Sequence, residues 1–355
     1  MNLSKCENCN YYNEMSALGQ EIVTVQFSTT ASHPSELRIL YNMVQECFLN
    51  MPQWGRDGLV IPLVFCLFAS LLATPLVLLA IFSNNNLRQE TRYLLLANTL
   101  FNDLIYSILT TFIAYLNAAD IGMPKIVCET LLFLLTVAYC NGILTITATV
   151  VDTYVAISWP LRYTSLLPRS RTIKIIACIW ILSVSSSSVL FIITLWTQEN
   201  PSSRLLVCAV PLVLLSSPLG TFLLKTAYIF AILYFLICLI LISSFYVMLY
   251  CKTRTSGIWV SNSRARQTYL IHLVLLIVYF SPLALLVAEG VLFGMHLIGR
   301  QSAVWIIVAV NNILMLPKAV LPYVYGLRYR DIANTIRSFF ILKSTAQVRP
   351  LQVST

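Results

Sequence analysis

The sequence predicts an all-α membrane protein, a seven-transmembrane helix bundle followed by a short amphipathic eighth helix. Of the 355 residues, 58% are hydrophobic and only 10% are charged, whereas a soluble domain carries about 25% charged residues. The hydrophobic residues form seven runs, each long enough to cross a hydrocarbon core of about 30 Å as a helix. Each run must be helical, because lipid offers the backbone no hydrogen-bond partner.

The seven predicted spans are residues 58–82, 93–116, 126–150, 173–196, 226–250, 267–292 and 303–326. A further apolar stretch, residues 205–224, is separated from the next span by Lys225 alone and contains Pro211 and Pro218. Because one residue cannot join two antiparallel helices, we interpret this stretch as a long apolar loop. The spans divide the chain into an N-terminal tail (1–57), a transmembrane domain (58–326) and a C-terminal helix and tail (327–355).

Basic residues predict the orientation of the bundle. Most of the 23 Lys and Arg residues fall in the loops and tail that follow the odd-numbered spans. Short cytoplasmic loops carry such an excess, so we expect a multi-pass plasma-membrane protein with its N-terminus outside and its C-terminus inside. Much of the net charge of +9 comes from these cytoplasmic residues, which the anionic lipids of the inner leaflet attract. We therefore expect no nucleic-acid partner.

Catalytic and metal-binding patterns are missing from the sequence. The three histidines are far apart, and no H-E-x-x-H, G-x-S-x-G or G-x-x-x-x-G-K motif occurs. We therefore expect no enzyme activity, no metal and no cofactor.

Five cysteines, Cys6, Cys9, Cys47, Cys128 and Cys208, fall on the predicted outer side, where disulfides persist. Cys128 opens the third span and Cys208 lies in the long apolar loop, so a bridge between them would hold this loop over the mouth of the bundle. The pairing of the other three stays open, and a local bridge or free thiols in the tail are both compatible with the sequence. Asn2 begins an N-x-S pattern and is a candidate glycosylation site.

Residues 152–163 read D-T-Y-V-A-I-S-W-P-L-R-Y. They resemble the D-R-Y-V-A-I-x-x-P-L-R-Y signature that closes the third helix of rhodopsin-like (class A) G-protein-coupled receptors. Other landmarks of that family follow in order: Asp103, Trp180, F-S-P at 280–282 and L-P-Y-V-Y at 321–325. A more distant likeness, to fish odorant receptors of the 131 type, is carried by L-R-Q-E at 87–90, T-S-G-I-W at 255–259, S-R-A-R at 263–266, L-P-K-A at 316–319 and L-R-Y-R at 327–330.

The resemblance implies a receptor that passes the signal of an unknown extracellular ligand to a heterotrimeric G protein. It assigns to the G-protein coupling region Asp152, Thr153, Tyr154, Pro160, Leu161 and Tyr325. Thr153 replaces the family's arginine and cannot make its charged bidentate contact, and Leu321 replaces the asparagine of the seventh helix. These departures suggest two alternatives: a receptor-like protein with weak or no coupling that acts through dimerisation or scaffolding, or a chemosensory receptor.

Two ionisable residues lie inside predicted spans. Asp103 matches the family's sodium-binding acid, and Lys318 lies one turn before Pro322 in the seventh span. An unpaired charge at the centre of a transmembrane helix costs about 3 kcal/mol or more. We interpret the two as an ion pair in which Lys318 replaces the sodium ion. The alternative is that Lys318 faces a water-filled cavity or extends outward.

Ligand-binding residues are expected in the outer halves of the spans. Leu135 occupies the position of the aspartate of amine receptors, so a biogenic amine is not expected. A mixture of apolar walls and a few polar groups is typical of small-molecule sites. The candidates are Leu135, Thr136, Tyr139, Phe280, Glu289, Asn311 and Asn312. Packing between helices is the alternative role for each of them, and close helix contact is the expected role of Ser185 to Ser188.

After Tyr325, apolar residues recur at helical spacing, at Ile332, Ile336, Phe339 and Phe340, with polar residues between them. This pattern predicts an amphipathic helix on the inner leaflet.

Overall fold

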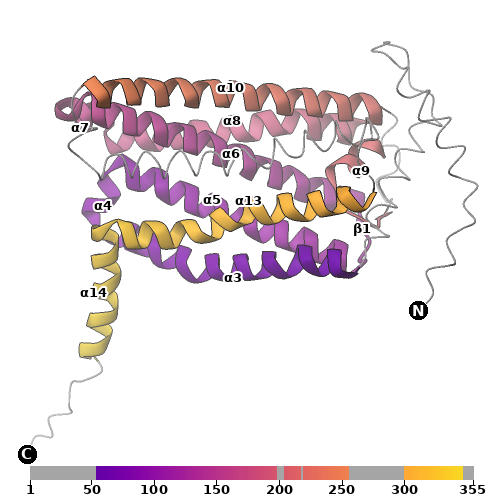
Figure 1. Ribbon diagram of the computed structural model, residues 1–355, viewed down its shortest axis with the longest axis horizontal. Coiled ribbons are helices and arrows are strands. Elements are labelled where there is room, and N and C mark those ends of the chain that lie inside the picture. The colour runs from indigo at the N-terminus through magenta and orange to yellow at the C-terminus, as the bar shows by residue number, and fades with distance from the viewer. Residues whose placement is uncertain (1–52, 198–203, 217–218, 256–299, 347–355) are drawn as a thin grey trace, which may run out of the picture.

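The computed structural model describes residues 53–197, 204–216, 219–255 and 300–346. Long helices run side by side along its longest axis (Figure 1). In chain order they are α3 (Gln53–Ser83), α5 (Thr91–Ala118), α6 (Lys125–Ser158), α8 (Arg169–Trp196), α10 (Gly220–Thr255) and α13 (Arg300–Arg328). The helix α14 (Arg330–Ala346) turns away from this bundle at one end.

The short elements lie at the two ends of the bundle. Figure 1 shows α4 (Asn85–Gln89) and α7 (Tyr163–Leu166) at the end where α14 begins, with β1 (Met123–Pro124) and α9 (Val210–Leu215) at the opposite end. The 3-10 turn η1 (Pro160–Arg162) precedes α7, and β1 pairs antiparallel with β2 (Arg204–Leu205). Helices α3, α5, α6, α8 and α10 therefore alternate in direction.

The predicted membrane fold is confirmed. Among the described residues, α3, α5, α6, α8 and α10 are each long and apolar enough to cross a membrane. They correspond to the first five predicted spans, and α13 contains the seventh. The sixth predicted span lies outside the described residues. The number of seven spans therefore remains a prediction from the sequence. A helix, α14, does follow the last span, and its place on the inner leaflet also stays a prediction.

The apolar stretch at 205–224 is not a membrane span, but it is more ordered than the expected loop. It contains α9, and its last residues already belong to α10, which begins at Gly220. The helix α9 forms there because Val213 is buried in an apolar cluster with Leu132 of α6 and Ile113 of α5. Burial of apolar surface at this end of the bundle therefore stabilises a helix in this segment. The sequence alone does not predict that helix, because the segment contains prolines.

Polar groups lie inside the bundle and apolar groups cover its surface. Phe65 of α3 and Ile181 of α8 are 71% and 66% exposed, whereas Asn102, Thr145 and Lys318 are at most 2% exposed. In water this arrangement would be unstable, but in lipid the exposed hydrophobic side chains meet hydrocarbon and the polar groups find partners within the protein.

A disulfide joins Cys128, in the first turns of α6, to Cys208, just before α9, with the Cα atoms 5.6 Å apart. Asn117 of α5 holds the same point from the other side. Its Nδ2 donates to the Cys208 carbonyl at 2.9 Å, and its Oδ1 accepts from the Cys208 N–H at 2.8 Å. The segment that leads into α9 is therefore attached to two neighbouring helices.

We expect Cys208→Ser to lower the free energy of unfolding by roughly 2–4 kcal/mol, because the bridge restricts the unfolded chain and positions α9. Thermal unfolding of the purified protein in detergent measures the change. Cys178→Ser is the matched control, because Cys178 is an exposed free cysteine of α8. Equal melting temperatures for the two variants would contradict a structural role for the bridge.

Candidate functional site

An ion pair lies in the interior of the bundle between α5 and α13. The Lys318 Nζ is 2.5 Å from the Asp103 Oδ1, and the two side chains are 1% and 3% exposed. The same Nζ lies 4.7 Å from the centroid of the Tyr106 ring, one turn along α5. The structure therefore brings together the two charged residues that the sequence places in separate spans.

The backbone carbonyl of Lys318 forms a contact with α3. Pro322 has no N–H group, so the carbonyl of Lys318 lacks its normal partner one turn later in the helix. The Ser70 hydroxyl of α3 donates to this carbonyl at 3.5 Å. Lys318 is thereby connected to α3 through its backbone and to α5 through its side chain.

A polar network next to this pair joins α5, α6 and α8. Asn98 Nδ2 donates to Thr145 Oγ1 at 2.9 Å and to Asn141 Oδ1 at 3.3 Å, and Trp180 Nε1 donates to Asn98 Oδ1 at 3.0 Å. Of these residues, the sequence analysis identified Trp180 alone. The signal for the others was present, because Asn98 with Asn102, and Asn141 with Thr145, are polar pairs one turn apart within apolar spans.

The coupling-region residues of α6 make local contacts. Asp152 Oδ1 accepts a hydrogen bond from the Tyr163 hydroxyl at 2.9 Å. Partial burial and the neighbouring Asp152 carboxylate raise the pKa of Tyr163, which keeps its proton available for this bond. Thr153 Oγ1 donates to the carbonyl of Thr149 in its own helix at 2.8 Å. Thr153, which stands where the family has arginine, therefore makes its hydrogen bond within its own helix.

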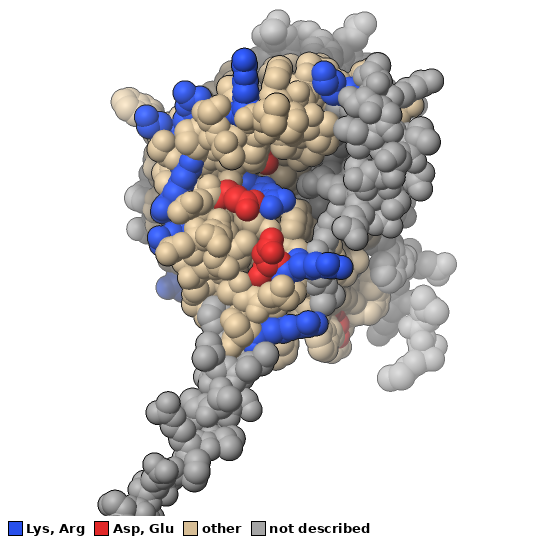
Figure 2. Space-filling model, turned by 90° about the vertical axis from the view of Figure 1, so that its left-hand side faces the viewer, with Lys and Arg blue, Asp and Glu red and all other residues tan. Residues whose placement is uncertain are grey.

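The other coupling residues lie at the same end of the molecule but in different surroundings. The Tyr154 ring contacts Phe245 of α10, with centroids 5.9 Å apart. Leu161 is 97% exposed in η1, directly after Pro160. Tyr325 stacks on Tyr329 and belongs to the apolar cluster that joins α13 to α3 and α5. Figure 2 shows many Lys and Arg side chains and few acidic ones on this face.

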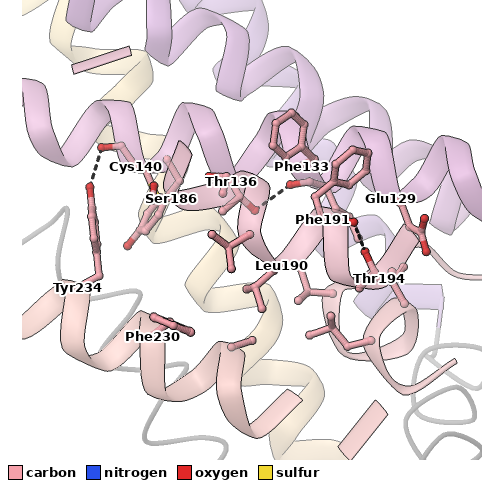
Figure 3. A pocket seen from close by; sticks show the side chains of 18 residues that line it. Glu129, Phe133, Thr136, Cys140, Ser186, Leu190, Phe191, Thr194, Phe230 and Tyr234 are labelled. Atoms are coloured by element: carbon pink, nitrogen blue, oxygen red, sulfur yellow. Dashed lines mark hydrogen bonds between the residues drawn. The ribbon is translucent and has the colours of Figure 1, made fainter. Parts of the chain in front are cut away.

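A cavity of about 390 Å³ opens between α6, α8, α9 and α10. Of the predicted ligand residues, Thr136 and Tyr139 line it, and Ser186 and Ser187 join them from α8. Figure 3 shows aromatic side chains along the cavity, with Glu129 toward one end and Tyr234 toward the other. Its size and mostly apolar lining are those of a small-molecule site.

The remaining predicted ligand residues are not brought to this cavity. Leu135 packs in the apolar clusters on the α5 side of α6, and Asn312 Nδ2 donates to the carbonyl of Gly58 at 3.1 Å. Phe280, Glu289, the side chain of Asn311 and the glycosylation candidate Asn2 lie outside the described residues. The sequence analysis missed Glu129, although an acid in the second turn of an apolar span was a visible signal.

Comparison with known proteins identifies the family. The profile described as "7 transmembrane receptor (rhodopsin family)" matches residues 73–325. The chain is 32% identical over 291 residues to the human protein named "Probable G-protein coupled receptor 148", covering 81% of this chain and 84% of that relative.

Two further relatives are more distant. Human "Olfactory receptor 4Q2" is 24% identical over 80% of this chain and 88% of its own length. The "QRFP-like peptide receptor" of Branchiostoma floridae is 26% identical over 47% of each chain. Taken with the helical bundle and the extent of the profile match, these similarities show that the chain belongs to the rhodopsin family of seven-transmembrane receptors.

Proposed function

We propose that this receptor binds an extracellular ligand in the cavity between α6, α8, α9 and α10 and signals to a heterotrimeric G protein. The observation that carries the proposal is the course of α6. Near its start, Glu129, Thr136 and Tyr139 line the cavity, and near its far end Asp152 and Tyr154 lie in the coupling region. A change in the packing of this one helix would couple the two ends.

The proposed orientation places the cavity in the extracellular half of the bundle. Basic residues of α4, η1 and the starts of α8 and α14 gather at the Asp152 end, which favours the cytoplasm. The disulfide at the opposite end favours the oxidising exterior. The receptor then has an extracellular tail over 1–57, a transmembrane domain over 58–326 and a cytoplasmic helix and tail over 327–355, with Asn2 exposed to glycosylation.

We also infer an atypical activation switch at the end of α6. Thr153 bonds to its own helix, and the acid before it, Asp152, takes the Tyr163 hydroxyl as its partner. Without a fixed cation at position 153, contact with the G protein would depend on the exposed Leu161 and on the surrounding basic residues. The same departure supports the second candidate, a receptor with little or no coupling that acts by dimerisation or as a scaffold.

The Asp103–Lys318 pair is proposed to occupy the place of a bound sodium ion. A buried pair leaves no uncompensated carboxylate to attract a free cation, and the Lys318 Nζ lies directly at the Asp103 oxygen. The pair would fix α5 against α13 with a permanent charge where a mobile ion would otherwise have to bind.

We expect Thr153→Arg to raise constitutive signalling at least twofold through one or more members of a panel of chimeric G proteins, because arginine restores a charged contact. Signalling is normalised to surface expression. Thr153→Ser, which keeps the hydroxyl bond to Thr149, is the control and should match the wild type. Flat output from Thr153→Arg across the whole panel would favour the non-coupling alternative.

Double-mutant analysis tests the ion pair. Asp103→Asn and Lys318→Met should each destabilise the receptor by about 3–5 kcal/mol, because each leaves one buried charge without its partner. The double variant should recover most of this loss in thermal unfolding. The exposed pair Arg56–Asp120 gives the control, since Asp120→Asn should change stability by less than about 1 kcal/mol. Failure of the double variant to recover would count against the pair.

Sodium dependence tests the replacement of the ion. We expect the melting temperature of the wild type to be equal in sodium chloride and in N-methylglucamine chloride at the same ionic strength. Lys318→Met frees Asp103 to bind a cation and should gain a sodium-dependent increase in melting temperature. A sodium effect in the wild type as large as that in the variant would show that Lys318 does not take the place of the ion.

A further inference from the structure

Glu129 is a buried acid at the end of the cavity nearest the disulfide. Its residue is 3% exposed, and it lines the cavity next to Thr194 (Figure 3). Among the described residues, neither of its carboxylate oxygens has a hydrogen-bond partner. A buried carboxylate normally accepts several hydrogen bonds, so these two oxygens are available to a ligand that donates one.

Several other polar groups of the cavity favour the same kind of ligand, although the Ser187 hydroxyl, which also lines it, has no hydrogen-bond partner among the described residues. Four hydroxyl groups in its wall already use their protons within the protein. The donors, each bonded to a backbone carbonyl, are Thr136, Ser186, Thr194 and Tyr234. These groups offer the cavity lone pairs and no proton, so the wall is rich in acceptors, and a ligand that supplies a donor complements it.

The charge of Lys125 determines whether the hydrogen-bond donor of the ligand should be charged or neutral. Its Nζ lies 3.8 Å from Glu129 Oε1, one turn earlier in α6, and the two side chains are 4% and 1% exposed. This distance is within reach of an ion pair and too long for a hydrogen bond. The lysine therefore already offsets the charge of the carboxylate, so an added ammonium group would be repelled by Lys125 and a ligand carboxylate would be repelled by Glu129.

The body of the ligand has to be apolar. Phe133 and Phe191 form a stacked pair with ring centroids 4.7 Å apart, and both line the cavity. Phe230 of α10 and Leu190 of α8 line it as well (Figure 3). A flat aromatic or compact aliphatic body would bury its surface against these side chains.

We propose that Glu129 is the polar anchor of the ligand site and that it accepts a hydrogen bond from a neutral hydroxyl or amide group on an otherwise apolar molecule. The inference rests on the proposed function in taking this cavity as the ligand site. It adds the head group that the site selects and the residue that selects it.

Three molecules with the same body test this selection: 4-biphenylmethanol, 4-biphenylmethylamine and biphenyl-4-carboxylic acid. Thermal stabilisation of the purified full-length receptor in detergent, measured against probe concentration, gives an apparent Kd for each. The alcohol should bind the wild type at least tenfold more tightly than the amine or the acid. Ala227→Phe, which fills the cavity from α10, should abolish this binding.

Two variants identify the anchor. Lys125→Met/Glu129→Leu removes both charges together and should bind the alcohol at least tenfold more weakly than the wild type does. Lys125→Met leaves the carboxylate without its counter-charge and should reverse the preference, so that the amine binds more tightly than the alcohol. A purely structural role for Glu129 predicts no such reversal. Asp120→Asn, an exposed acid at the same end of the bundle, is the matched control and should leave all three affinities unchanged.

The inference is overturned if the wild type binds the three probes equally, binds none of them, or retains its preference for the alcohol in the double variant. Because binding is measured without a G protein, the result is separate from the signalling assay. Flat signalling with selective binding would reject the coupling proposal alone. Signalling without head-group selection would reject the anchor alone.

Discussion

Polar groups within the bundle must find their partners inside the protein, because the surrounding hydrocarbon supplies none. The Asp103–Lys318 pair is the strongest case, since two opposite charges at the centre of the bundle hold α5 and α13 at one distance. The neighbouring Asn98 network does the same with neutral groups for α5, α6 and α8. Apolar side chains form buried clusters between the helices and also cover the outer surface of the bundle.

Helix α6 connects the cavity to the Asp152 end, the two regions on which the proposed function rests. Its first turns carry the disulfide to Cys208 and the Lys125–Glu129 pair, its first half lines the cavity, and its last turns carry Asp152. Threonine hydroxyls along it bond back to its own carbonyl groups, as Thr147 and Thr153 do. Asn141 and Thr145 attach α6 to Asn98 of α5, and the Tyr234 hydroxyl of α10 donates to the Cys140 carbonyl of α6.

The relatives identify the class of protein, and their ligands differ in kind. The chain belongs to the rhodopsin family of seven-transmembrane receptors, a family of receptors and not of enzymes. The similarity that covers most of both chains is to a probable receptor, and the two more distant relatives are named for odorant and peptide reception. As the proposed ligand site, the acceptor-rich, apolar cavity favours a small molecule over a peptide, because its size and lining match a compact and poorly charged ligand.

The sequence by itself determined the fold class, the spans now seen as α3, α5, α6, α8 and α10, and the residues of the Asp152 motif. Hydrophobic run length and motif spacing are local properties that each segment carries alone. Only the tertiary structure decided that α9 is helical, that Leu135 packs toward α5, and that Glu129 lies against a cavity with no hydrogen bond to its oxygens from the described residues. These properties depend on the rotation of each helix and on the neighbours it meets, which arise from packing between segments far apart in the chain.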